Sequence, residues 1–261
     1  MNEAPLILTP DWALPLGVQA FVTTRQGGYS QSPWSNFNLA LHVGDDAAHA
    51  GANRDLLCQT LQARAGRDPF CIQWLQQVHG CAVYEARLPC QNSPSPQADA
   101  LYTRQRGIAC AVLTADCVPV LFCAEDGSEV AAAHAGWRGL LGGVLEQTLA
   151  RFRSPPGGIR AWLGPGIGPC HFEVGAEVRE AFIQAAGQQR EATLAAFTAG
   201  PDAPGQTRRY YADLYQLARL RLTALASVSG GDACTVCEPE RWYSHRSAAP
   251  TGRFASGILR A

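Results

Sequence analysis

The chain has 261 residues, enough to bury a large hydrophobic core in one large domain or in two small ones. Its formal net charge is −1 and only 16% of its residues are charged, so bulk electrostatics gives no attraction to nucleic acid or to an anionic membrane. All 21 basic residues are arginine, which excludes a Schiff-base lysine, a pyridoxal-phosphate enzyme and a lysine-dependent phosphate loop.

The sequence carries no sign of export or of membrane insertion. Residues 1–5 lack the basic start and the apolar core of a secretion signal. The longest apolar stretch, 108–123, is interrupted by Asp116 and Pro119 and is too short to span a membrane. Ten cysteines in such a chain indicate reduced thiols. We therefore expect a cytoplasmic protein, a monomer or weak homodimer, with no nucleic-acid or membrane partner.

The N-terminal part of the chain predicts a strand and then a capped helix. Residues 18–24 have the β-branched and aromatic content of a strand. Asp45 or Asp46 can cap a helix that runs to about Ala65, because Gly66 just beyond it supplies a stop signal.

Further strands are predicted before the centre of the chain. Residues 70–77 form one strand, which we expect to pair with 82–86. Proline, serine and asparagine then mark a surface loop over 89–97, and the apolar run 108–113 is an additional buried strand.

A hairpin follows at the centre of the chain. Two apolar runs, 118–123 and 129–134, flank an Asp-Gly pair at 126–127, a combination that favours a two-residue turn. Counting outward from such a turn places Pro119 opposite His134. A longer turn would shift this register and exchange the faces of the strands.

The second half of the chain predicts helices that alternate with strands. The helices cover 139–152, 175–198 and 213–226; the strands cover 159–163, the surroundings of Cys234 and 254–259; a connection covers 199–207. The glycine-rich segment 164–169 lacks the spacing of a dinucleotide-binding loop, and a tight turn beside a ligand is the alternative. No repeat or clear linker is present, so we expect a single α/β domain over 1–261.

Two imidazoles and one thiol stand in unusual contexts: His79 in Gln-Val-His-Gly, Cys117 in Thr-Ala-Asp-Cys and His134 in Ala-His-Ala-Gly-Trp-Arg-Gly. The hairpin register puts Cys117 on the face of His134, on a diagonal of about 7–8 Å that a shared ion can bridge. His79 is remote in sequence, and nothing local requires it to join them. If the three converge, they form a zinc site whose fourth position is free for water or substrate, as in catalytic zinc sites.

The remaining histidines and cysteines are interpreted as structural. A Cys-x-x-Cys at 234–237 lacks a second pair, which disfavours a redox or metal role. Exposed or satisfied histidines are expected at His42, His49 and His171. Buried inert thiols are expected at Cys58, Cys71, Cys110 and Cys123.

Four arginines are candidates for binding phosphate or another anion. Arg138 lies four residues after His134, at a predicted helix start where main-chain amides favour anions. The other three candidates stand out by their sequence contexts: Arg54, Arg246 and Arg253.

Together these motifs resemble the YfiH-like family, whose members have been described as multicopper polyphenol oxidases or laccase-domain proteins. The resemblance runs over nearly the whole chain, through 38–45, 53–54, 77–80, 98–100, 114–119, 133–139, 163–170 and 251–253. It implies zinc on His79, Cys117 and His134. The chain departs from the family at 244–246, where Ser-His-Arg replaces Ser-Tyr-Arg, and this argues against a role for His245.

The resemblance also implies a fold and an activity. The fold is a sandwich of two β-layers flanked by helices, α/β/β/α, related to the catalytic domain of the cytotoxic necrotizing factor toxins. The activity is zinc-dependent phosphorolysis of adenosine, inosine, guanosine and methylthioadenosine, with adenosine deamination as a side activity. Zinc would lower the pKa of a water molecule toward 7, arginines would place the phosphate, and Asp116 or Asp99 is the candidate for protonating the departing base.

Three alternatives stay open. Cys117 can instead be a nucleophile that His134 activates, as in a cysteine hydrolase. Some members of the family are described as peptidoglycan editing factors, which implies removal of wrongly built cell-wall precursors. A copper-dependent polyphenol oxidase is the third alternative, because copper outcompetes zinc at nitrogen and sulfur donors, although a multicopper oxidase needs more histidines than the six present here.

Overall fold

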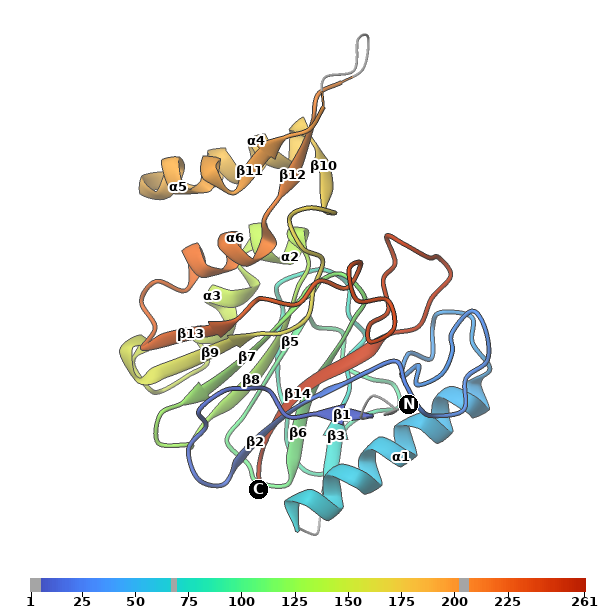
Figure 1. Cartoon of the computed structure of the whole chain (residues 1–261). Helices are drawn as coiled ribbons and strands as arrows, with labels where there is room; N and C mark the ends of the chain where they lie inside the picture. The colour runs from blue at the N-terminus through green and yellow to red at the C-terminus, as the bar shows by residue number, and fades with distance from the viewer. Residues whose placement is uncertain (1–5, 67–69, 202–206) are drawn as a thin grey trace.

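Two β-sheets packed face to face form the centre of the molecule (Figure 1). The computed structural model describes residues 6–66, 70–201 and 207–261. In pairing order, the first sheet contains β1 (Ile7–Leu8), β2 (Val18–Thr23), β14 (Phe254–Arg260), β6 (Ile108–Thr114) and β3 (Cys71–Gln73). The second contains β13 (Ser227–Gly230), β9 (Ile159–Leu163), β7 (Val118–Ala124), β8 (Val130–Ala135), β5 (Ala100–Thr103) and β4 (Val83–Glu85).

Helices cover the outer faces of both sheets. Helix α1 (Ala47–Ala65) packs on the five-stranded sheet, and α2 (Trp137–Gly142), α3 (Val144–Leu149) and α6 (Leu214–Arg221) pack on the six-stranded sheet. The remaining elements are α4 (Ala176–Ala185), α5 (Arg190–Ala195), the short turns η1 (Pro156–Gly158) and η2 (Gly187–Gln189), and a small sheet of β10 (Glu173–Gly175), β12 (Arg209–Ala212) and β11 (Phe197–Ala199). The expected α/β/β/α architecture is confirmed.

Strand β6 shows why the layers stack in this way. Ile108, Cys110 and Val112 pack between the two sheets, whereas the residues between them pack toward α1. Successive side chains of a strand point to opposite faces, so a strand buried on both faces must be apolar along its whole length. The sequence Ile-Ala-Cys-Ala-Val-Leu-Thr meets that requirement, and all seven residues are buried.

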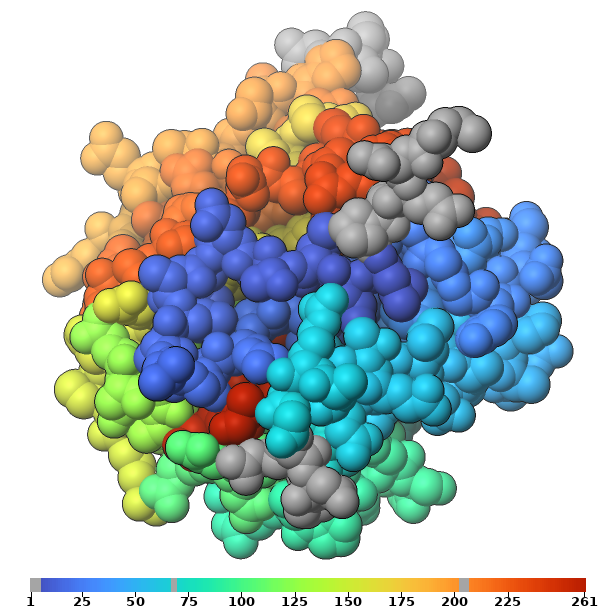
Figure 2. Space-filling model, turned by 60° about the horizontal axis from the view of Figure 1, so that its bottom comes forward, coloured from blue at the N-terminus to red at the C-terminus, as the bar shows by residue number. Residues whose placement is uncertain are grey.

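Strand β14 lies between β2 and β6 although it comes last in the chain. It pairs with both neighbours in antiparallel fashion. Figure 2 shows this arrangement from another direction: atoms from the end of the chain form a small red patch beside blue atoms of its N-terminal part and green atoms of its middle. The middle of the five-stranded sheet is therefore built from segments far apart in sequence.

The predicted hairpin is confirmed by the pairing of β7 and β8. Pro119 lies opposite His134, which is the predicted register. The predicted two-residue turn is not formed, because the amide of Gly127 donates to the carbonyl of Ala124 at 2.9 Å and the loop covers 125–128. The Asp126 carboxylate accepts a hydrogen bond from the amide of Ser128 at 2.8 Å and thereby closes the turn. This register is what presents His134 near the end of β8, beside the start of β7.

The capped helix is also confirmed. The side chain of Asp46 accepts a hydrogen bond from the amide of Ala48, and the amide of Gly66 donates to the carbonyl of Gln62. The predicted strands at 18–24, 108–113, 159–163 and 254–259 are present as β2, β6, β9 and β14.

The predicted pairing of 70–77 with 82–86 is wrong. β3 pairs in parallel with β6, and β4 pairs in parallel with β5, so the two segments belong to different sheets. The chain between them crosses from one sheet to the other, and this crossing carries His79.

The helix predicted over 139–152 is two helices. Gly143 has φ of 95°, a left-handed conformation that ends α2 and begins α3. The segment predicted as helical over 175–198 is likewise divided into α4, η2 and α5 before β11 begins.

Two further predictions in the second half need correction. The helix predicted over 213–226 ends at Arg221, and the strand expected around Cys234 is a single bridge between Gly166 and Cys234. The predicted connection at 199–207 includes residues 202–206, which lie outside the described residues, as do residues 1–5.

Cys71 and Cys90 form a disulfide, with their Cα atoms 6.2 Å apart. The expectation of reduced thiols throughout is therefore wrong for this pair, while the other eight cysteines are free. Within the described ranges, no helix is both long enough and apolar enough to cross a membrane.

Candidate metal centre

The three predicted ligands converge. The metal-binding atoms of His79, Cys117 and His134 lie within 4.8 Å of one another. His134 comes from β8, Cys117 immediately precedes β7, and His79 comes from the crossing between β3 and β4. The two imidazole rings meet edge to face, with their centroids 4.8 Å apart. The structure thus brings together side chains that sequence spacing alone linked only in part.

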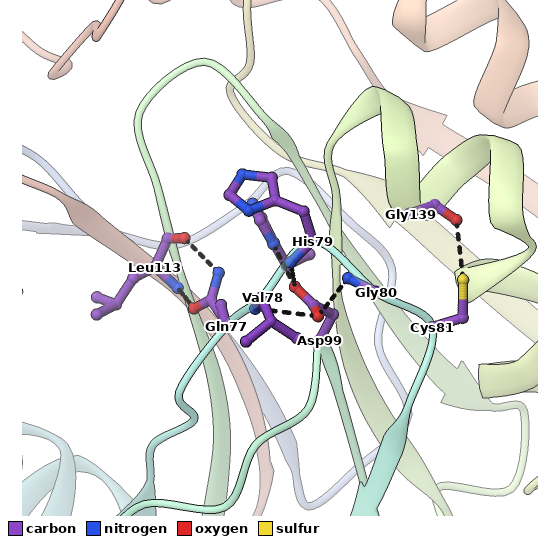
Figure 3. A network of polar contacts seen from close by, with 9 residues as sticks. Gln77, Val78, His79, Gly80, Cys81, Asp99, Leu113 and Gly139 are labelled. Carbon is purple, nitrogen blue, oxygen red and sulfur yellow. Dashed lines mark hydrogen bonds and ion pairs between the residues drawn. The ribbon is translucent and has the colours of Figure 1, made fainter.

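Asp99 holds both histidines in place (Figure 3). Its carboxylate is fully buried and accepts hydrogen bonds from the amides of Val78, His79 and Gly80 at 3.2, 2.9 and 2.7 Å. Oδ1 of Asp99 also lies 2.9 Å from Nδ1 of His134. One buried carboxylate therefore fixes the main chain at one imidazole and the ring of the other.

The contact between Asp99 and His134 decides which imidazole nitrogen is available. A carboxylate accepts hydrogen bonds, so Nδ1 of His134 carries a proton, and Nε2 is the nitrogen that faces Cys117 and His79. Carboxylate-to-histidine contacts of this kind orient the ligands of metal sites. Asp99 is fully buried, and both of its oxygens are occupied by these contacts. The sequence signal for it was an aspartate between two alanines before an apolar strand.

The thiol of Cys117 is held in its ionised form. Burial by itself raises the pKa of this thiol, but the charge of His134 and hydrogen bonds from His134 and His79 lower it to about 6. Burial lowers the pKa of His134, whereas the charge of Cys117 and the bond to Asp99 raise it to about 9. A thiolate is the form of cysteine that binds metals.

Gly136 lets the three side chains approach. A Cβ atom at this position would lie 2.8 Å from Sγ of Cys117 and 3.1 Å from Cδ2 of His79. The glycine of the Ala-His-Ala-Gly-Trp-Arg-Gly motif is thus explained by space beside the thiol.

Two non-glycine residues in the described chain have positive φ, and both belong to this region. His79 has φ of 59° and Asp116 has φ of 93°. Such backbone conformations are uncommon and persist where surrounding contacts determine them. The amide of His79 is bound by Asp99. The carboxylate of Asp116 accepts from the hydroxyl of Thr235 and from the amide of Arg246, both at 2.7 Å.

A cavity of about 310 Å³ opens over the three ligand candidates. This is within the range of small-molecule sites, about 300–1,000 Å³. Besides the three candidates, its wall includes Asp116, Arg246, Arg253, Gln77, His42, His245 and Phe172.

Two of the four candidate arginines line this cavity, and two do not. Arg246 and Arg253 belong to the wall. Arg138 is exposed, with its guanidinium over the ring of Trp137 at 4.4 Å. Arg54 donates to the carbonyl of Leu39 at 2.8 Å, and burial lowers its pKa to about 10. The structure therefore does not bring Arg54 and Arg138 to the cavity wall.

Sequence reasoning missed two histidines of the wall. His42 was interpreted as structural or exposed and His245 as an unlikely participant, yet both line the cavity. Burial, then the charges of Arg253 and Arg54, lower the pKa of His42. The available signal was that His42 lies within a distinctive segment, Asn-Leu-Ala-Leu-His-Val-Gly-Asp.

The glycine-rich segment 164–169 packs on β7 rather than on the cavity. A Cβ at Gly164 would lie 2.7 Å from Cγ of Pro119, and one at Gly166 would lie 2.8 Å from Cγ2 of Val118. Gly164 and Gly166 are therefore required by close contact with β7.

Fold and site together define an α/β/β/α protein with a cysteine–histidine candidate metal centre at the wall of a cavity. The sequence profile of a family described as multi-copper polyphenol oxidoreductase laccase matches residues 19–261. Similar proteins include one named purine nucleoside phosphorylase from Pseudomonas aeruginosa, 46% identical over 95% of this chain and 96% of its own length. Another is purine nucleoside phosphorylase YfiH from Escherichia coli, 46% identical over 97% of this chain and 98% of its own length.

Solved structures agree with this assignment. A Neisseria meningitidis protein superposes with a TM-score of 0.86 at 41% identity, covering 98% of this chain and 99% of its own. YfiH from Bacillus licheniformis superposes with a TM-score of 0.81 at 29% identity, covering 94% of this chain and 93% of its own. The chain belongs to the YfiH family.

Proposed function

We propose that this chain is a zinc-dependent purine nucleoside phosphorylase acting on adenosine, inosine, guanosine and methylthioadenosine, with adenosine deamination as a side activity. One observation carries the proposal: three metal-binding side chains and two arginines line the same cavity. The reaction class is supported by relatives that are named purine nucleoside phosphorylase, such as the Escherichia coli protein at 46% identity.

The donor set fits zinc. One thiolate and two imidazoles are ligands that zinc accepts, and three protein donors leave a fourth position for a reactant. The bond from Asp99 to His134 supplies the support that such ligands need. When bound, the ion supplies a Lewis acid beside the cavity. Copper also binds nitrogen and sulfur donors, so it is the second candidate metal, and a copper-dependent polyphenol oxidase is the corresponding alternative activity.

We assign binding of the phosphate to Arg246 and Arg253. Phosphorolysis forms a bond from a phosphate oxygen to the anomeric carbon of the ribose and breaks the bond from that carbon to the purine nitrogen. The purine departs with the electron pair and takes up a proton. Guanidinium groups bind phosphate oxygens through paired N–H donors, and burial of Arg253 strengthens such a contact.

Phe172 offers a surface for the purine ring. It lies in the cavity wall, and the guanidinium of Arg246 lies 5.3 Å from the centroid of its ring. Aromatic side chains bind flat heterocycles by offset stacking. Phosphate and base would therefore be recognised by neighbouring groups of one wall.

Asp116 is proposed as the group that protonates the departing base. It lies in the cavity wall next to Cys117. Its two oxygens accept hydrogen bonds from the hydroxyl of Thr235 and the amide of Arg246, which fix the carboxylate at the wall. The alternative role of Asp116 is to position Arg246, and the variant Asp116→Asn distinguishes the two roles. Loss of a proton donor changes the pH profile of the activity, whereas loss of a positioning residue raises KM for phosphate.

The direct test is incubation of the zinc-loaded protein with adenosine, with and without phosphate. Adenine that forms only with phosphate supports phosphorolysis, and inosine that forms without phosphate supports deamination. Absence of both products, with guanosine and methylthioadenosine also unchanged, contradicts the proposal.

A cysteine hydrolase acting on cell-wall precursors is the second candidate. Asp99, His134 and Cys117 follow one another as an orienting carboxylate, a base and a thiol do in such enzymes. A triad of this kind needs one imidazole, so the convergence of a second one, His79, favours the metal site. Full activity on a muramyl-amino acid precursor without metal, abolished by alkylation of Cys117, would establish the hydrolase instead.

A further inference from the structure

A second group of metal-binding side chains lies outside the cavity. The donor atoms of Cys170, His171, Cys234 and Cys237 lie within 4.8 Å of one another. None of the four belongs to the cavity wall described above. The group joins the segment before β10 to the segment after β13, which are distant in sequence.

Distances within the group fit one ion. Nδ1 of His171 lies 3.7 Å from Sγ of Cys234 and 3.6 Å from Sγ of Cys237. Tetrahedral zinc, with bonds of about 2.3 Å to sulfur and about 2.0–2.1 Å to nitrogen, sets the sulfur–nitrogen separation at about 3.6 Å. Sγ of Cys170 lies 3.0 Å from Nδ1. This exposed side chain has to move by only about 0.6 Å to match the same geometry.

Main-chain contacts hold the group without an ion. The amide of Gly168 donates to Sγ of Cys234 at 3.2 Å, a hydrogen bond that supports a thiolate ligand. A Cβ at Gly168 would lie 3.1 Å from the same sulfur, so a glycine keeps this approach open. The amide of Thr235 donates to the carbonyl of Gly166 at 2.9 Å. Hydrogen bonds and close packing therefore position the backbone of both segments that carry the group.

We propose that Cys170, His171, Cys234 and Cys237 bind a structural zinc ion. Three thiolates and one imidazole form a closed tetrahedral set, the composition of structural zinc sites. A disulfide between two of the cysteines would leave the imidazole without a role. His171 instead has its Nδ1 within 3.7 Å of all three sulfurs, which is the position of a fourth ligand.

This ion would brace one wall of the cavity. Thr235, next to Cys234, donates its hydroxyl to Asp116 at 2.7 Å. Arg246 donates to the carbonyl of His171 at 3.4 Å. Phe172 follows His171 directly and lines the cavity. The second site thus reaches the first through main-chain neighbours rather than through shared ligands.

Metal counting tests the proposal independently of any activity. The full-length protein is loaded with zinc under reducing conditions, dialysed and measured by plasma mass spectrometry. We expect two zinc ions per chain in the wild type and one each in Cys237→Ser and in Cys117→Ser. Cys58→Ser is the matched control, because this free cysteine belongs to neither group and should leave both ions bound.

Cobalt distinguishes the two sites. Thiolate-to-cobalt absorption scales with the number of thiolates, so Cys117→Ser should retain about three quarters of the intensity and keep a tetrahedral spectrum. If Cys237→Ser does not fold, Cys170→Ser, another exposed position, replaces it. One zinc per chain in the wild type that remains bound in Cys237→Ser overturns the proposal. The proposal is also overturned if the protein binds no metal and treatment with a reductant frees two more thiols among Cys170, Cys234 and Cys237, because this result identifies a disulfide.

Discussion

The two groups of cysteine and histidine side chains are held by different means. At the first, His134 is only 3% exposed and the buried carboxylate of Asp99 fixes it. At the second, Cys170 and Cys237 are exposed and main-chain amides position the neighbouring sulfur of Cys234. The first group has three donors beside a cavity, whereas the second has four outside it.

The number of ligands at each site is related to how the protein holds them in place. An ion with four protein ligands completes its own cage, so binding and local folding can proceed together. A site with three ligands must hold its geometry while one position exchanges reactants, and a buried carboxylate provides that rigidity. Donor count and the kind of support therefore point to the same division between chemistry and structure.

The largest expected effect separates the two groups directly. Cys117→Ala should lower kcat/KM for phosphorolysis by about 1,000-fold, because a metal centre contributes several kcal/mol of transition-state stabilisation. Cys237→Ser should instead lower the midpoint temperature of thermal unfolding while most of the turnover is kept. Turnover assays and thermal unfolding on both variants make the comparison. Equal losses of activity in the two would break the distinction.

The carboxylate support is tested next. Asp99→Asn should weaken metal binding or activity by about 10–100-fold, the cost of losing a group that orients a histidine ligand. Glu129→Gln is the matched control, since Glu129 is also buried but accepts hydrogen bonds from Tyr102, Arg153 and Ser154 rather than from the ligand candidates. Competition with a chelator measures the affinity. Unchanged zinc affinity in Asp99→Asn would contradict the positioning role.

The next prediction tests which arginine binds phosphate. Arg246→Gln should raise KM for phosphate by about tenfold or more, because hydrogen bonds to charged groups contribute about 1.5–3 kcal/mol. Arg138→Gln should leave this KM unchanged, because Arg138 is exposed and outside the cavity wall. Initial rates over a range of phosphate concentrations decide the matter, and the reverse ranking would move the phosphate site to the start of α2.

Close approach at Gly136 gives a smaller effect. Gly136→Ala places a Cβ 2.8 Å from Sγ of Cys117, so we expect zinc affinity at the first group to fall by about tenfold, within the range seen when ligand orientation is disturbed. The backbone at Gly136 has φ of −70°, which alanine adopts without strain. Gly51→Ala in α1 meets no atom within 4 Å and should stabilise that helix by about 0.5–1 kcal/mol. Equal zinc affinity in the two variants would show that the thiol can give way.

The last prediction concerns Glu129, a buried carboxylate that belongs to neither group of metal-binding side chains. Burial alone raises the pKa of Glu129, but hydrogen bonds from Tyr102, Arg153 and Ser154 lower it below its ordinary value of 4.5. Its stabilisation is therefore fully present above pH 4.5 and is lost as the pH falls through the lower pKa of the folded state. Denaturant unfolding of Glu129→Gln should show a loss of about 2 kcal/mol at pH 7 that shrinks in acid. A loss independent of pH would assign the effect to packing.

Local patterns predicted what local physics determines. The hairpin register was predicted from the Asp-Gly pair and the two-residue period of a strand, and it placed Cys117 and His134 together. The limits of α1 followed from Asp46 and Gly66, whose hydrogen bonds are formed within a few residues.

Features that depend on distant segments were missed. His79 reaches the centre only because β3 and β4 belong to different sheets, and their adjacency in sequence suggested a direct pairing instead. Asp99 binds amides some twenty residues earlier in the chain, which no periodicity reveals. Cys170 lies next to the Cys-x-x-Cys at 234–237 through the bridge of Gly166 with Cys234, so the pair appeared isolated in the sequence.

The position of β14 has a consequence for synthesis. Ribosomes release the chain from its N-terminus, so β2 and β6 emerge long before the strand that separates them in the finished sheet. Until β14 inserts, each has an unpaired edge, and such edges invite association between nascent chains. Arg246 and Arg253 arrive in the same late portion, so a growing polypeptide carries its thiol and imidazoles before it has the cavity that uses them. We expect protection by chaperones to matter most during this interval.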